Sequence, residues 1–238
     1  MRSFVIILFI LISSFCSFVH SADFKVTNEI YLDISHGRKP LGRIILGLFG
    51  DEAPKTVENF RHICLYGIDG LSYNGTRFHR VIFKFMIQGG DILKGDGAGS
   101  ISIFGKHFED ENLTINHTAP GFIGMANQGP DTNGCQFYIT TVPTPWLNQK
   151  HTIFGKIVNG QEWAHVIERV KTTTDDEPVE AVVITACGEL KVDKPYIIND
   201  MYNYDIWGWI KSATVPVTMS IIILSIFRHF IKMLDKYA

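Results

Sequence analysis

Short apolar runs separated by glycine and asparagine fill the middle of the chain, and they constrain its fold more than any other feature. The runs span residues 78–88, 122–126, 136–142 and 152–158 of a chain of 238 residues. Short runs bounded by turn residues are typical of β-strands. Many such strands, with only occasional helices between them, indicate an antiparallel barrel or a sandwich.

Further strands are predicted on either side of these runs. Apolar residues at even spacing from Val26 to Ile34 form one face of a strand, and turn residues around Gly37 and Pro40 follow it. Residues 42–49 are predicted as the returning strand. A last strand near residues 181–187 completes the set.

Two helices are predicted within the same region. The first covers residues 54–66, with segment 51–54 (D-E-A-P) supplying its cap and first-turn residues. The second covers residues 160–168, where three apolar residues share one side. The acidic, proline-containing stretch 175–178 is predicted as a surface loop.

The apolar residues are concentrated at the two ends of the chain. The whole sequence is 46% hydrophobic and 19% charged, with a mean hydropathy of +0.11. Residues 1–21 contain 14 apolar residues and one charge, and residues 200–238 contain 23 apolar residues and seven charges. The remaining 178 residues are about 40% apolar, which is ordinary for one globular domain with a sizeable core.

Residues 1–21 have the order of a secretory signal peptide. A basic Arg2 is followed by an apolar run from Phe4 to Ile12 and then by small and polar residues, with cleavage expected after Ser21. The alternative is an uncleaved signal anchor. The apolar run is short for a membrane span of about 20 residues, and a cleavage site follows it, so cleavage is favoured.

Residues 206–227 are predicted to form a transmembrane helix. The segment has 22 residues with one charge, and at about 1.5 Å per residue it is long enough for a bilayer core. Three basic residues against one acid in the tail 228–238 place that tail in the cytoplasm. The alternative is an amphipathic helix in the membrane interface, but segment 221–224 is apolar on every face.

These ends predict a single-pass type I protein of the secretory pathway, with residence in the endoplasmic reticulum membrane expected. The folded domain, residues 22–190, would lie in the lumen, and residues 191–205 would link it to the membrane. No K-D-E-L-type retention signal ends the chain, so export remains an alternative.

Cysteines and glycosylation sequons are compatible with that compartment. Cys64, Cys135 and Cys187 remain after signal cleavage, so at most one disulfide can form, and buried free thiols are expected. Acceptor sequons begin at Asn74, Asn112 and Asn116. We expect at least one of them to be glycosylated.

Charge and motif content exclude several functions. The net charge is −2 in total and −4 within residues 22–199, which argues against nucleic acid as a main partner. The glycine-rich stretch 89–99 lacks the P-loop order, and the chain has neither a G-x-S-x-G elbow nor an H-E-x-x-H pair. Its nine histidines show no zinc spacing. We therefore expect neither a metal nor a cofactor.

Three segments carry an unusual density of apolar and amide side chains. They are F-H-R-V-I-F-K-F-M-I-Q-G-G (78–90), G-M-A-N-Q-G-P-D-T-N-G-C-Q-F-Y (124–138) and W-L-N-Q-K-H-T-I-F-G (146–155). With the flanking P-K-T-V-E-N-F-R and F-E-D-E-N, they resemble the signature of the cyclophilins, the cyclosporin-binding peptidyl-prolyl isomerases, over residues 25–190. The two apolar ends and stretches such as N-F-R-H-I-C are most similar to the membrane-anchored photoreceptor cyclophilin of flies.

The resemblance implies an eight-stranded antiparallel barrel capped by two helices, with a peptide-binding site on it. It assigns catalysis to Arg80, Phe85, Gln88 and His151. It assigns substrate binding to Met86, Ala126, Asn127, Gln128, Gln136, Tyr138, Trp146 and Leu147.

Each group of side chains has an implied role in this site. Arg80 would be the cation at the prolyl nitrogen, while the apolar members would hold the proline ring, with His151 at the edge of their pocket. The amides would hold peptide carbonyls or orient Arg80, and Trp146 at the rim accompanies cyclosporin binding in the family. Each of these residues also has an ordinary structural interpretation when it is considered alone. The apolar side chains would be core residues, and Arg80 would be a solvated arginine.

Two residues depart from the family pattern. Tyr138 stands where most members have phenylalanine, and its hydroxyl would cost about 1–3 kcal/mol if it were buried without a partner. Lower turnover is therefore expected, unless the hydroxyl points to water. Gln128 replaces a small residue and is expected to narrow the neighbouring pocket, which accepts the residue two before proline. A tighter substrate range would follow.

The resemblance predicts an isomerase of X-Pro bonds in proline-containing client polypeptides. The likeness to the photoreceptor subgroup implies an opsin as the membrane client. The alternative is a tethered escort chaperone that binds a client in the same groove with little or no turnover. Tethering would favour membrane clients in either case, because it raises their effective concentration at the groove.

Overall fold

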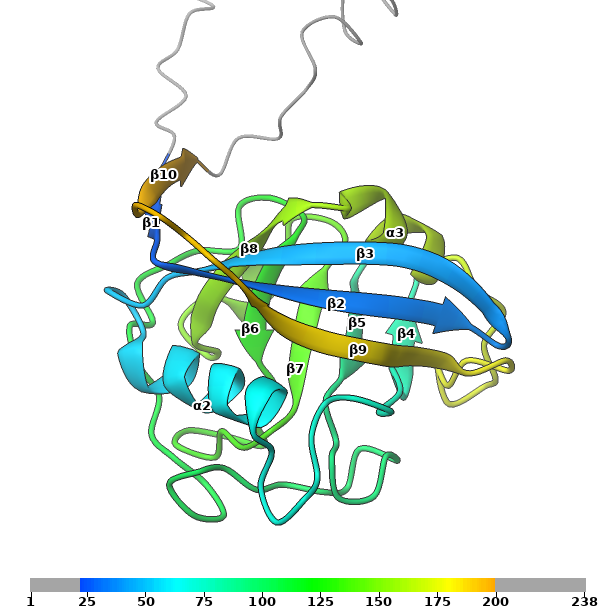
Figure 1. Ribbon diagram of the computed structural model, residues 1–238. Coiled ribbons are helices and arrows are strands. Elements are labelled where there is room, and N and C mark those ends of the chain that lie inside the picture. The colour runs from blue at the N-terminus through cyan, green and yellow to red at the C-terminus, as the bar shows by residue number, and fades with distance from the viewer. Residues whose placement is uncertain (1–21, 200–238) are drawn as a thin grey trace, which may run out of the picture. The chain divides into compact units, whose positions relative to one another are not determined.

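The computed structural model describes residues 22–199, which form a mainly β protein (Figure 1). Eight strands make one antiparallel sheet in the order β4-β5-β7-β6-β8-β3-β2-β9. The strands are β2 (Asn28–His36), β3 (Lys39–Leu48), β4 (Arg80–Ile82), β5 (Met86–Gly89), β6 (Phe122–Met125), β7 (Phe137–Thr140), β8 (Ile153–Asn159) and β9 (Val182–Leu190). The number of strands and their antiparallel pairing confirm the sequence prediction.

The sheet curves so that its two edges come together. Arg77, just before β4, forms an antiparallel bridge with Val183 of β9. On either side of it, the Phe78 N–H donates to the Val182 carbonyl at 2.9 Å and the Ile184 N–H donates to the Thr76 carbonyl at 2.8 Å. These bonds satisfy backbone groups that an open sheet edge would leave unpaired.

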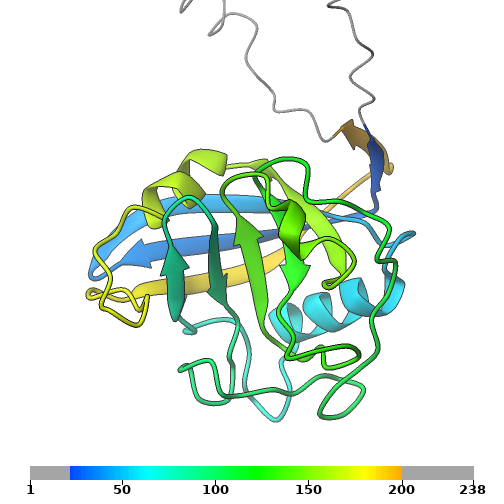
Figure 2. The ribbon, with the colours of Figure 1, turned by 180° about the vertical axis from the view of Figure 1, so that it is seen from behind.

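The core lies inside this curved sheet. Ile30, Leu32 and Ile34 of β2 are at most 2% exposed, which confirms the predicted alternation. Helix α2 (Pro54–Leu65) and helix α3 (Gln161–Ile167) lie at opposite sides of the sheet, as Figures 1 and 2 show. Phe60 of α2 is fully buried among the rings of the core.

The start of α2 is capped from a distant loop. The residue before the helix is Ala53, which has no capping side chain. Instead, the backbone N–H groups of Lys55 and Thr56 donate to the two carboxylate oxygens of Glu111, at 3.1 and 2.7 Å. The prediction that segment 51–54 supplies the cap is therefore wrong in this respect. The carboxylate offsets the unpaired N–H groups and the partial positive charge of the helix N-terminus.

The connection between β2 and β3 is tighter than predicted. It consists of Gly37, with φ +57°, and Arg38, so that Pro40 already lies within β3. Pro40 has no N–H to donate, and its place near the start of a strand limits that cost.

A second, smaller sheet joins the two ends of the described chain. β1 (Asp23–Val26) pairs antiparallel with β10 (Tyr196–Asn199). Its inward side chains pack on a separate apolar cluster that includes Phe24, Phe49 and Phe122. Residues 191–205, predicted as a linker, thus contain a strand that packs on the domain.

One disulfide ties helix α2 to strand β9. Cys64 and Cys187 are bonded, with a Cα–Cα distance of 5.8 Å, and Cys135 is a buried free thiol. The expectation of free thiols is therefore correct for Cys135 and wrong for the other two. The two bonded cysteines are 123 residues apart in the sequence and meet only because β9 lies beside α2.

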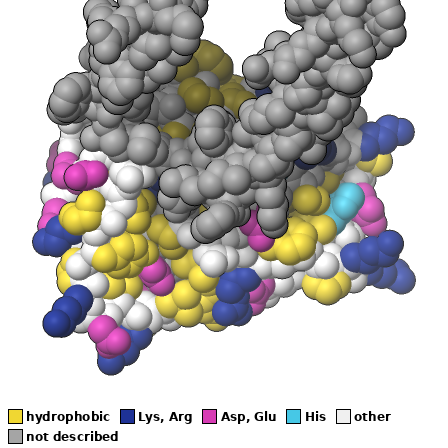
Figure 3. All heavy atoms as spheres, turned by 90° about the horizontal axis from the view of Figure 1, so that it is seen from above, with side chains coloured by type: hydrophobic (Ala, Val, Ile, Leu, Met, Phe, Trp, Pro, Cys, Tyr) yellow, Lys and Arg dark blue, Asp and Glu magenta, His cyan; other side chains and the backbone are white. Residues whose placement is uncertain are grey.

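The predicted signal peptide (1–21), transmembrane helix (206–227) and tail (228–238) lie outside the described residues. Between residues 22 and 199, no helix is long and apolar enough to cross a membrane. On the face that Figure 3 shows, basic and acidic side chains are interspersed with hydrophobic ones. No continuous field of one sign covers that part of the surface.

Candidate active site

Four neighbouring strands bring the predicted site residues together. β4, β5, β7 and β6 are consecutive in the sheet. In their register, Arg80 lies opposite Gln88, and Gln88 lies opposite Tyr138. Residues far apart in the sequence therefore become lateral neighbours, because antiparallel pairing places them side by side.

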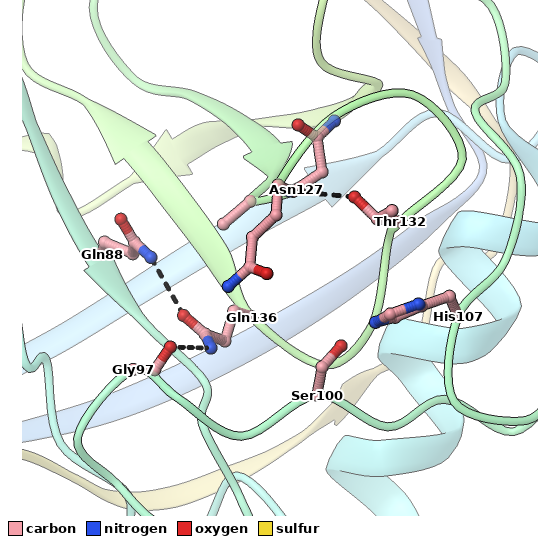
Figure 4. Close-up of a pocket in the computed structure, with 9 residues that line it drawn as sticks. Gln88, Gly97, Ser100, His107, Asn127, Thr132 and Gln136 are labelled. Carbon is pink, nitrogen blue, oxygen red and sulfur yellow. Dashed lines mark hydrogen bonds between the residues drawn. The ribbon is translucent and has the colours of Figure 1, made fainter.

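Two glutamine side chains form a chain of amide hydrogen bonds (Figure 4). The Gln88 amino group donates to the Gln136 oxygen at 2.9 Å. The Gln136 amino group donates in turn to the carbonyls of Gly97 and Gly99, at 2.8 and 2.7 Å. Each bond orients the next amide, so the Gln88 oxygen is the outer end of the chain and can accept a hydrogen bond.

Aromatic and aliphatic side chains form the apolar part of the site. The rings of Phe85 and Trp146 have centroids 5.6 Å apart, and Trp146 is 54% exposed. Met86 of β5 is only 3% exposed, whereas Leu147 is partly buried and follows Trp146 in a short 3-10 helix (Pro145–Leu147). A hydrogen bond from the Thr141 N–H to the Phe85 carbonyl holds the loop between β4 and β5 in place.

Tyr138 is buried, and its hydroxyl has a partner. The hydroxyl lies 2.6 Å from Nε2 of His117, which is itself 1% exposed. Nδ1 of His117 lies 3.0 Å from Oδ1 of Asn148, and the His117 backbone N–H donates to the same oxygen at 2.8 Å. Because an amide oxygen only accepts, Nδ1 carries the proton, Nε2 accepts, and Tyr138 donates.

His151 lies at the edge of the same aromatic group. Its ring is perpendicular to that of Tyr138, with centroids 5.5 Å apart, and its Nδ1 lies 3.0 Å from the Met125 carbonyl. The same logic makes Nδ1 the donor. Burial lowers the pKa of His151 below its ordinary value, so the ring is neutral at neutral pH.

A polar pocket of about 70 Å³ lies beside the amide chain (Figure 4). Of the predicted site residues, it is lined by Gln88, Ala126, Asn127, Gln128 and Gln136. Gln128 thus lies in the wall of this pocket, and its effect on the residue two before proline stays a prediction. The Asn127 side chain donates to the Lys150 carbonyl at 2.9 Å, which ties this wall to the segment before β8.

Four residues of this pocket were not predicted as site residues: Gly97, Ser100, His107 and Thr132. Among them, His107 has an exposed side chain that borders the pocket. Gly97 has a φ of +90°, and a Cβ there would lie 2.9 Å from ring atoms of His79. The glycine-rich stretch was the available signal, and it was used only to exclude a P-loop.

Arg80 lies on the accessible side of this group. Its side chain is 48% exposed, and its Nε lies 3.5 Å from Oδ2 of Asp176. Asp176 belongs to the loop predicted over 175–178 and was not predicted to be near the site.

The predicted site residues therefore form one connected group. Arg80 stands next to the amide chain of Gln88 and Gln136, and the strand register places Gln88 beside Tyr138, whose ring contacts His151. The group combines an exposed guanidinium, apolar side chains and oriented amides. It can bind and polarise a peptide without forming a covalent bond to it.

Comparison with known proteins agrees with this chemistry. A family model described as cyclophilin type peptidyl-prolyl cis-trans isomerase/CLD matches residues 31–189. A Calliphora vicina protein named "Peptidyl-prolyl cis-trans isomerase, rhodopsin-specific isozyme" is 54% identical over 219 residues, which are 92% of this chain and 93% of that protein.

Two further relatives match a shorter part of the chain. The peptidyl-prolyl cis-trans isomerase D of Saccharomyces cerevisiae is 48% identical over 71% of this chain and 75% of its own length. A peptidyl-prolyl cis-trans isomerase of Arabidopsis thaliana, CYP21-1, is 46% identical over 72% of this chain and 80% of its own length. The chain therefore belongs to the cyclophilin-type peptidyl-prolyl cis-trans isomerases.

Proposed function

We propose that this isomerase accelerates X-Pro rotation through Arg80, in a membrane-anchored protein of the secretory pathway that serves an opsin-type client. Rotation about a peptide bond faces a barrier of about 18–20 kcal/mol, because amide conjugation is lost midway. A donor at the prolyl nitrogen stabilises the pyramidal nitrogen of that twisted state and not the planar ground state. Arg80 supplies this donor, since its guanidinium stays charged at all relevant pH values.

The connected geometry of the site is the observation that carries this proposal. The apolar side chains around Phe85 and Met86 offer a surface for the proline ring. The outer oxygen of the Gln88 amide chain is a fixed acceptor next to Arg80 in the sheet register. Such preorganised groups lower the barrier without reorganising during the reaction.

Substitution of Arg80 tests the mechanism. We expect Arg80→Ala to reduce kcat/KM for a proline-containing peptide about 100-fold or more, as loss of a preorganised donor does. Arg38→Ala is the matched control, because Arg38 is exposed in the β2–β3 turn. Unchanged isomerisation in Arg80→Ala would overturn the assigned role.

The client and the location are inferred from likeness and from the ends of the chain. The Calliphora relative that is called rhodopsin-specific matches this chain over 92% of its length. The apolar segments 1–21 and 206–227 suit a signal peptide and a single span. We expect that photoreceptor cells without the protein retain opsin in the endoplasmic reticulum, and that the full chain restores its maturation. Normal opsin maturation without the protein would exclude this client.

A second function, client binding without turnover, is favoured by one observation. Phe83, in the loop between β4 and β5, and Trp146, beside Phe85, are each 54% exposed. Exposed aromatic side chains can hold a client whether or not its X-Pro bond is turned over. Arg80→Ala separates the two functions in the same cells. If opsin maturation persists when isomerisation is lost, the groove acts as an escort, and catalysis is not its physiological role.

Glycosylation is part of the proposal for a lumenal domain. Asn74 and Asn116 are exposed, as modification requires. Asn112 is partly buried, and its side-chain amide donates to Glu52, which makes it a poorer acceptor. Endoglycosidase treatment of the protein from secretory cells should increase its gel mobility. Asn74→Gln combined with Asn116→Gln should remove that shift.

A further inference from the structure

The loop that carries Asp176 is the neighbour of Arg80 on the open side of the site. Oδ2 of Asp176 lies 3.5 Å from Nε of Arg80. The loop also joins the strand that carries Arg80, because the Val81 N–H donates to the Asp176 carbonyl at 2.8 Å. Two independent contacts therefore connect Asp176 to β4.

The loop holds its shape through its own hydrogen bonds. Thr172 and Pro178 form an antiparallel bridge at its base. Within it, the Thr173 N–H donates to the Glu177 carbonyl at 2.8 Å and the Asp176 N–H donates to the Thr173 carbonyl at 3.3 Å. Asp176 has a φ of +63°, a conformation that Asp and Asn adopt more readily than most residues.

A second ion pair fastens the same loop to the barrel. Glu177 lies 2.7 Å from Nη1 of Arg77. Arg77 is held independently, because its Nε donates to the Gly95 carbonyl at 2.7 Å. The backbone that carries the Asp176 carboxylate is therefore held in place by contacts on the neighbouring residue.

The site of contact on the guanidinium matters for its chemistry. Arginine has five N–H donors in a planar fork, and one of them is at Nε. A carboxylate beside Nε restrains the plane of the group and leaves both terminal nitrogens for another partner. Without that restraint, a half-exposed arginine would sample several rotamers.

We infer that Asp176 is a positioning residue that orients Arg80 for X-Pro rotation. The inference rests on the proposed role of Arg80. Asp176 acts through Arg80 and does not itself touch the substrate. Its effect therefore falls on the chemical step, and binding of the peptide is left largely unchanged.

The test compares two charge removals in one loop. Asp176→Asn keeps the size, the backbone conformation and the bond to Val81, and removes only the carboxylate charge. Asp175→Asn removes an equal charge from the neighbouring, exposed side chain of the same loop. We expect Asp176→Asn to lower kcat about fivefold, with KM unchanged within twofold, and Asp175→Asn to leave both unchanged. Equal effects of the two variants would show that only the general charge of the loop matters, and would overturn the inference.

Salt gives a readout that needs no variant. Salt screens an exposed ion pair, and the screening length shrinks severalfold between roughly 0.05 and 1 M NaCl. Over this range, the kcat of the wild-type protein should fall toward that of Asp176→Asn. Asp176→Asn itself should show no such dependence. A wild-type kcat that is flat across this range would contradict the inference, whether or not the variant folds well.

The Arg80 variants separate failure of the inference from failure of the proposed function. In an Arg80→Lys background, which lacks Nε and the fork, Asp176→Asn should have no further effect on kcat. A further fivefold loss there would mean that Asp176 acts on something other than Arg80. If Arg80→Ala is fully active, the proposed function fails. If Arg80→Ala is inactive while Asp176→Asn equals wild type, only the inference fails.

Discussion

The hydroxyl of Tyr138 donates a hydrogen bond to Nε2 of His117 across 2.6 Å inside the protein. The sequence alone suggested a hydroxyl that lowers turnover unless it points to water. The structure shows a third arrangement, in which the hydroxyl is buried and paired. The ring of Tyr138 packs edge-on against His151, with the two planes nearly perpendicular.

Removal of the hydroxyl should affect stability more than activity. Tyr138→Phe leaves Nε2 of His117 buried without a partner, which costs about 1–3 kcal/mol in free energy of unfolding. Isomerisation of a short peptide should change less than twofold. Urea unfolding and peptide exchange measurements check the two outcomes. A tenfold rise in kcat with unchanged stability would show that the hydroxyl interferes with the proline ring.

Acid should destabilise the protein through His117. Burial lowers the pKa of His117 to about 4, below its unfolded value of about 6.5. Between these values the unfolded chain binds more protons, so stability falls as pH drops from 6.5 to 4, by up to about 3 kcal/mol. His117→Gln should remove this part of the pH dependence. His79 and His151, whose pKa values burial also lowers, contribute in the same direction and remain in the variant.

The His117 prediction has a direct spectroscopic check. The ring resonances of His117 should titrate near pH 4 in the folded protein, with Nε2 unprotonated above that pH. A stability profile for His117→Gln that parallels the wild type between pH 7 and 4 would contradict the assignment.

The distant cap of helix α2 should be worth a measurable free energy. Glu111→Ala removes the acceptor for the N–H groups of Lys55 and Thr56, and we expect a loss of about 1–2 kcal/mol in free energy of unfolding. Glu109→Ala is the control, because Glu109 contacts only the exposed end of Lys55 in a surface ion pair, and it should cause no measurable change. Equal losses in both variants would show that general acidity, rather than capping, stabilises the helix.

Gln128 should restrict which peptides the polar pocket admits. Gln128→Ala removes a side chain from the wall of a pocket of about 70 Å³. We expect kcat/KM for peptides with a bulky residue two before proline to rise about tenfold, since one to two methylene-sized contacts are worth roughly that factor. Peptides with glycine at that position serve as the internal control and should not change. An equal rise for both peptide series would contradict a role in selection.

Much of the fold could be predicted because its signals are local. The alternation in β2 and the apolar side of α2 depend only on the spacing of neighbouring residues, and both elements were predicted to within two residues at most ends. The site residues were predicted from ordered motifs, and each motif is one continuous stretch of chain. Segment 78–90, for example, contains β4, β5 and the loop between them. β10 could not be found in this way, since it is four residues long and pairs with β1 from the other end of the domain.

What the sequence determined by itself was the two helices, most strands of the main sheet, their order along the chain, and many of the side chains that the structure brings together near Arg80. The tertiary structure alone decided which residues that are distant in the sequence form hydrogen bonds, caps and disulfides with one another. Glu111 caps a helix that begins 57 residues earlier, Cys187 reaches Cys64 across 123 residues, and His117 pairs with Tyr138. The physical reason is that buried donors and acceptors must find partners wherever the fold brings them. Sequence spacing carries no information about such encounters.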